Sequence, residues 1–148
     1  MTPRRRAVVL WILQGLFFLR VMGQIYVGLY APPWLPPWQE WYSGLLPYSL
    51  LLPVQAILLM WMTIISYDNS RGTGWFCVES PRLRRWLRWF AYVYAGSMLL
   101  RYVIVMTFRP EMRWVHDTIP ILFHFVLAGY AFALTVVSEK ESNKNIVG

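Results

Sequence analysis

Six polar side chains within long apolar stretches are the residues of this sequence best suited to chemistry. They are Arg20, Gln24, Gln55, Tyr94, Arg101 and His124. Arginine and glutamine donate hydrogen bonds to carbonyl or phosphate oxygens, and histidine can serve as proton donor or hydrogen-bond partner. Their types predict a polar pocket for an anionic or carbonyl-bearing group: a lipid headgroup, a quinone or an acidic segment of a partner protein.

The spacing of these residues places several of them on common helix faces. Arg20 and Gln24 are four residues apart, and Tyr94, Ser97 and Arg101 follow at intervals of three and four. Residues at such intervals lie on one side of an α-helix. If the apolar stretches cross a membrane, all six side chains except Tyr94 fall in its outer half. The expected pocket therefore opens toward the outer surface, with Tyr94 deeper.

A structural role for the two arginines is the competing interpretation. An arginine at the centre of a bilayer costs from about 2.5 kcal/mol upward, so each should have a partner. The apolar stretches contain no deep acidic residue, but long arginine side chains can reach toward the surface. The partners expected there are helix carbonyls or the acids at the outer rim, which are Glu40, Glu111 and Asp117. A lone histidine such as His124 is likewise more often a hydrogen-bonded packing residue than a ligand.

Signals for catalysis, metal binding or a haem are weak. The sequence has no HExxH pattern, no nucleophile elbow and no glycine-rich phosphate loop. Cys77 is the single cysteine, which excludes a disulfide within the chain and leaves too few ligands for zinc. His116 and His124 lie eight residues apart and cannot ligate one haem from both sides. We predict no catalytic or metal-binding residues, and the cofactor is open between a quinone, a lipid and none.

The composition indicates what kind of structure must hold the polar side chains. Hydrophobic residues make up 57% of the 148 and charged residues only 14%, too apolar for an ordinary soluble domain. Four stretches are long enough to cross a membrane as helices, which takes about 20 residues. The sequence predicts an all-α, four-transmembrane-helix bundle in a single domain over 1–148. We expect its helices at 7–30, 44–67, 82–108 and 118–138, followed by a polar tail at 139–148.

Local signals support two of these boundaries. The polar segment Asp68–Gly74 contains two glycines and is expected to end the second helix. The pair Ser80-Pro81 is a favourable helix start, with serine as cap and proline in the first turn. The first stretch also resembles a secretory signal, but it lacks a cleavage site and stays apolar beyond Arg20. We therefore expect it to remain as a membrane span.

The positions of the basic residues predict the orientation. Of the 14 Lys and Arg residues, ten lie at the expected inner ends of the stretches and only Arg109 and Arg113 at the outer side. Such a bias places the basic ends in the cytoplasm. We therefore expect both termini to be cytoplasmic and the protein to reside in a plasma membrane, such as the bacterial inner membrane. The basic residues that give the net charge of +7 lie mainly at the expected membrane borders, and the sequence contains no recognised nucleic-acid-binding module. We therefore expect no nucleic acid as a partner.

A proline- and tryptophan-rich connector at 31–43 is the second feature of functional interest. Its paired prolines exclude a helix. Its tryptophans, Trp34, Trp38 and Trp41, are of the kind that settles at the membrane–water boundary. They form either such a belt or a rigid ledge on which a partner protein docks.

Three functions follow in order of preference. The first is a non-catalytic accessory or structural subunit of a larger plasma-membrane complex, in contact with lipids and other integral membrane proteins. The alternative is a quinone- or lipid-binding protein, with or without a redox role, that uses the polar pocket. The third is a small channel or carrier formed by oligomerisation, in which the arginines select anions.

Overall fold

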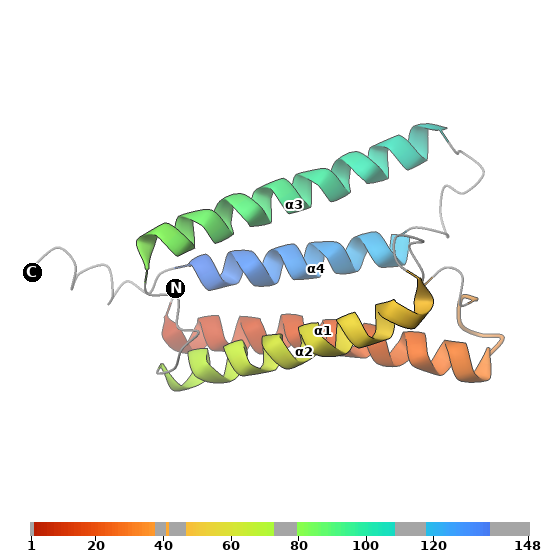
Figure 1. Cartoon of the computed structure of the whole chain (residues 1–148), viewed down its shortest axis with the longest axis horizontal. Coiled ribbons are helices and arrows are strands. Elements are labelled where there is room, and N and C mark those ends of the chain that lie inside the picture. Colours follow the sequence, from red (N-terminus) through yellow and green to blue (C-terminus); the bar gives the residue numbers. More distant parts are fainter. Residues whose placement is uncertain (1, 38–40, 42–46, 73–79, 109–117, 137–148) are drawn as a thin grey trace, which may run out of the picture.

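The protein is an all-α chain of four long helices. The computed structural model describes residues 2–37, 41, 47–72, 80–108 and 118–136. The helices are α1 (Pro3–Tyr30), α2 (Tyr48–Arg71), α3 (Pro81–Phe108) and α4 (Thr118–Thr135). They run up and down in alternation along the long axis, so that the start of α1 and the end of α4 lie at the same end of the molecule (Figure 1). The expected all-α class with four helices is confirmed.

Capping groups define both ends of α1. The side chain of Thr2 accepts a hydrogen bond from the backbone N–H of Arg5, and a proline occupies the first turn. Ala31 ends the helix in the left-handed conformation (φ 42°), with its N–H bonded to the carbonyl of Val27. The helix begins earlier than the expected range 7–30, so the N-terminal arginines belong to its first turns.

The end of α2 lies further along the chain than the sequence indicated. The segment 68–74 was expected to be a turn, yet α2 continues to Arg71. The side chains of Asn69 and Ser70 bond to carbonyls one turn earlier in the same helix, which supports the last turn. Gly72 then ends α2 with φ 68°, a conformation that glycine adopts without strain.

The ends of the last two helices follow from local hydrogen bonds. Helix α3 begins at Pro81, and the carbonyl of Ser80 accepts the N–H of Arg84, as the serine–proline pair predicts. Helix α4 ends at Thr135, short of the expected 138. The polar tail at 139–148 lies outside the described residues.

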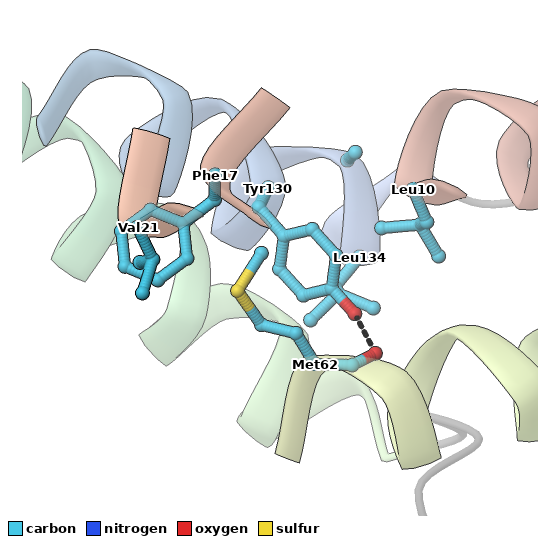
Figure 2. Close-up of a cluster of buried hydrophobic side chains, with 7 residues drawn as sticks. Leu10, Phe17, Val21, Met62, Tyr130 and Leu134 are labelled. Atoms are coloured by element: carbon cyan, nitrogen blue, oxygen red, sulfur yellow. Dashed lines mark hydrogen bonds between the residues drawn. The ribbon is translucent and has the colours of Figure 1, made fainter. Parts of the chain in front are cut away.

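The apolar core is built by three of the helices. It comprises Leu10, Phe17 and Val21 of α1, Met62 of α2, and Tyr130, Ala133 and Leu134 of α4 (Figure 2). The Tyr130 hydroxyl donates to the carbonyl of Met62 (2.8 Å) and pairs with the hydroxyl of Ser66 (2.9 Å). A polar link between α2 and α4 is thus buried within the apolar cluster.

Helix α3 stands apart from this core. Helix α1 contacts both α2 and α4, whereas α3 contacts α4 alone among the four described helices. Figure 1 shows that the C-terminal end of α3 diverges from the N-terminal end of α4. The order of neighbours is therefore α2, α1, α4, α3, with α3 at one edge.

Candidate functional site

Arg20 is the centre of a buried polar cluster between α1, α4 and the connector after α1. Only 7% of its surface is exposed. Its Nη1 donates to Oε1 of Gln24 (2.9 Å), and its Nη2 donates to the carbonyl of Trp41 (3.0 Å). The guanidinium carbon lies 5.6 Å from the centre of the Phe123 ring, a cation–π geometry. These partners are an amide, a carbonyl and a ring rather than an acid.

Gln24 and Gln55 extend the cluster from α1 to α2. Nε2 of Gln55 donates to Oε1 of Gln24 (3.3 Å), and both side chains are buried. Three buried polar atoms of this cluster have no hydrogen-bond partner among the described residues: Arg20 Nε, Gln24 Nε2 and Gln55 Oε1. Such groups cost free energy unless they bind a water or a ligand. A water molecule or the polar group of a ligand at these atoms would remove that cost.

A tyrosine–histidine pair joins α3 to α4. The hydroxyl of Tyr94 lies 2.6 Å from Nδ1 of His124, with the two rings edge to face. A hydroxyl and a ring nitrogen at this distance share a hydrogen bond, and a proton can pass along it. The charges of Arg20 and Arg101 both act on His124, so both arginines lie in its neighbourhood. Arg101 is half-buried.

Five of the six candidate residues thus form two neighbouring groups, and Arg101 lies near the second of them. Arg20, Gln24 and Gln55 make one group, and Tyr94 and His124 make the other. Phe123 and His124 are consecutive in α4, and they connect the two groups because Arg20 stacks on the first and acts electrostatically on the second. The rim acids Glu40, Glu111 and Asp117 lie outside the described residues. Their expected pairing with the arginines therefore stays a prediction.

The connector tryptophans do not share one environment. Trp34 is 72% exposed and its ring approaches that of Tyr26. Trp41 is half-buried and folds back onto α1, where a Cβ on Gly23 would lie 2.9 Å from its ring. Its carbonyl also holds Arg20. Trp38 lies outside the described residues. Of the expected docking ledge, Trp34 has the exposure to meet a partner, whereas Trp41 supports the cluster.

Two arginines that the sequence interpretation assigned only to topology have a specific role at the end of α4. Nη1 of Arg6 in α1 donates to the carbonyl of Val136 (3.5 Å), and Nη2 of Arg88 in α3 donates to that of Thr135 (3.3 Å). The last carbonyls of a helix lack partners within it and carry partial negative charge. Both arginines therefore stabilise the C-terminus of α4. No local pattern could have revealed this, because their partners are more than 40 residues away.

The chemistry open to the site is hydrogen bonding to a carbonyl or phosphate oxygen, with the Tyr94–His124 pair able to move a proton. Among the described residues, no group of three His, Cys, Asp or Glu side chains is placed to hold a metal ion. Comparisons with protein-family models, with curated proteins and with solved structures find no match to this chain. The function must therefore be argued from the helices and the site.

Proposed function

We propose that this protein is a four-span integral membrane protein, and that it is a non-catalytic accessory or structural subunit of a larger complex in a plasma membrane. By length and composition, α1 and α2 are able to cross a membrane, and α4 contains a shorter apolar helix, within the part of the chain that is described. The proposal adds α3 and α4 as the remaining two spans and places both termini in the cytoplasm.

Low burial of the apolar helices supports the membrane assignment. In the most apolar part of α1 28% of the residues are buried, and in that of α2 17%. A soluble protein of this size would leave an apolar surface too large to remain in water. Lipid acyl chains solvate such a surface, and arginines at the same ends of the helices meet the inner headgroups.

The observation that carries the subunit role is the open side of α3. Among the described helices it contacts α4 only, and large side chains such as Leu100 and Val103 are exposed. Gly96 lies on the same exposed side, with nothing within 4 Å of the position of its Cβ. Membrane helices associate through small residues that let backbones approach closely. We take the occupant of this side to be a transmembrane helix of another integral membrane protein.

The polar cluster supports a structural role as well. Two nitrogens of Arg20 are engaged by Gln24 and by the carbonyl of Trp41, and Tyr94 is engaged by His124. These hydrogen bonds join the helices and the connector to one another, and none of them requires a bound ligand.

Purification of a tagged chain from native membrane in a mild detergent, followed by mass spectrometry, tests the subunit role. We expect a stoichiometric membrane-protein partner with the wild type. Gly96→Leu should release that partner, because the leucine side chain fills the open space at Gly96. We call this space the notch, and it is where the partner helix would approach the backbone of α3. Gly15→Leu on α1 is the matched control, since its Cβ position is also open, and should keep the partner. A chain that purifies alone, or that loses its partner equally in both variants, contradicts the proposal.

A second candidate function is quinone or lipid binding in the polar cluster. The unpaired atoms of Arg20, Gln24 and Gln55 favour it, because a carbonyl or phosphate group could use them. The same purification distinguishes it by an absorption spectrum and a lipid extract. A retained quinone or a single lipid class, reduced by Gln24→Leu while the fold persists, would favour this candidate over the first. The third function, an oligomeric channel or carrier, stays a prediction.

A further inference from the structure

The first turns of α3 carry a basic groove that is separate from the polar cluster. Its cavity has a volume of about 470 Å³ and is lined by Pro81, Arg84, Arg85, Arg88, Trp89 and Tyr92. Three of these side chains are guanidinium groups, and none of the described lining residues is acidic. Arg88 is held at the edge by its hydrogen bond to the Thr135 carbonyl at the end of α4. The groove therefore concentrates positive charge at a fixed place.

A second groove continues the first along α3. It has a volume of about 250 Å³, is lined by Trp86, Trp89, Phe90 and Val93, and exposes almost only apolar surface. Trp89 lines both grooves, so the basic part leads directly into the apolar part. Along the helix the arginines Arg84, Arg85 and Arg88 begin the series, Trp86 and Trp89 lie among and just after them, and Phe90 and Val93 follow.

This order matches the chemistry of a phospholipid. Guanidinium groups bind phosphate oxygens through two parallel hydrogen bonds, which makes arginine well suited to phosphate recognition. Tryptophan and tyrosine rings lie at headgroup level, and apolar side chains meet the acyl chains below. We propose that the two grooves together bind one anionic phospholipid, with the phosphate at Arg84 and Arg85 and an acyl chain against Phe90 and Val93. The site rests on the proposed membrane orientation, in which the start of α3 faces the inner leaflet.

The apolar groove distinguishes the lipid from a free phosphate ion. A free phosphate would use only the arginines, whereas a lipid also gains from the apolar surface at Trp86 and Val93. Phosphatidylglycerol is the appropriate probe because it is a common phospholipid with a net negative charge. Phosphatidylcholine has the same phosphate but no net charge and serves as the neutral comparison.

Native mass spectrometry of the full chain in detergent, titrated with each lipid, tests the proposal. We expect the wild type to retain one phosphatidylglycerol in preference to phosphatidylcholine. The double variant R84Q/R85Q should bind phosphatidylglycerol roughly 25-fold more weakly, about fivefold for each basic residue next to an anionic surface. Arg88 stays unchanged in this variant because it also holds α4.

The matched control is R5Q/R82Q. It removes the same charge from exposed arginines at the same end of the molecule, and neither residue lines the groove. We expect it to bind phosphatidylglycerol as the wild type does. Equal weakening in both double variants would mean that charge alone attracts the lipid, and would overturn the site. Val93→Asp places a charge in the apolar groove and leaves the arginines unchanged, so it should also weaken lipid binding.

Two further outcomes are decisive. If inorganic phosphate displaces the lipid at equal concentration, the arginines bind the free ion and the lipid assignment is wrong. Extraction with alkaline carbonate tests the membrane proposal by itself. Release of the wild type without detergent would overturn the proposed function. A chain that stays in the membrane while R84Q/R85Q binds phosphatidylglycerol normally would overturn only the groove.

Discussion

The two sides of α4 are held by different kinds of contact. On the side of α1 and α2, α4 contributes Tyr130, Ala133 and Leu134 to an apolar core with buried hydrogen bonds to α2. On the side of α3, the contacts include the Tyr94–His124 hydrogen bond, the Arg88 bond to the end of α4 and a ring contact between Tyr92 and Phe132.

The difference between these two sides of α4 separates the helices that form the apolar core from the helix that carries the proposed binding surfaces. No α3 residue belongs to the apolar core cluster. The apolar core cluster therefore belongs to α1, α2 and α4, whereas α3 is joined to it through α4 alone among the described helices. Both proposed binding surfaces, the notch at Gly96 and the basic groove, lie on α3. The edge helix presents the binding surfaces and the other three support it.

Leu10→Ala should have the largest effect on stability. Leu10 is fully buried in the core, and removing a buried leucine side chain costs about 2–5 kcal/mol through lost packing and the cavity left behind. Leu19→Ala is the matched control, because Leu19 lies on the same helix and is 66% exposed. The measurement is thermal unfolding in detergent followed by circular dichroism. Equal effects of the two substitutions would contradict the three-helix core.

Arg20→Gln should have the next largest effect. It leaves the carbonyl of Trp41 without its donor, and an unsatisfied buried group costs about 1–3 kcal/mol. Arg5→Gln, an exposed position on the same helix, is the control and should leave the unfolding midpoint unchanged. Gly23→Val tests the same connection from the other side, since its side chain would push the Trp41 ring away. Unchanged stability in Arg20→Gln, with loss of a bound small molecule, would instead favour the ligand-binding candidate.

Tyr94→Phe should have the smallest effect, and it should be confined to α3. It removes one hydrogen bond to His124, worth about 1 kcal/mol, while the ring contact remains. Hydrogen exchange of the backbone amides measures this: α3 should exchange faster while α1 and α2 keep their protection. Faster exchange in all four helices would show that α3 is part of the cooperative core and would remove the distinction between the two sides of α4.

The sequence predicted the candidate cluster better than it predicted the partners within it. Arg20 and Gln24 could be paired in advance because residues four apart share a helix face, and the structure joins them by a hydrogen bond. The partners expected for Arg20 were the acids at the rim or the carbonyls of a helix. The described partners are a glutamine and a backbone carbonyl, and neither carries a charge that a sequence pattern would reveal. The continuation of α2 through Asn69 and Ser70 was missed because polar residues near glycine usually signal a turn.

Local sequence patterns are enough to predict the four helices, the start of α3 at Pro81 and the polar residues that interrupt the apolar stretches. These follow from interactions between near neighbours: apolar runs, capping side chains and the rigidity of proline. Three features follow from helix packing instead: α3 contacts α4 alone among the described helices, Trp41 folds onto Gly23, and Arg6 and Arg88 each bond to a carbonyl at the end of α4. Those outcomes depend on which helix faces pack together. Packing involves residues far apart in the chain, so no pattern of neighbouring residues indicates which faces will meet.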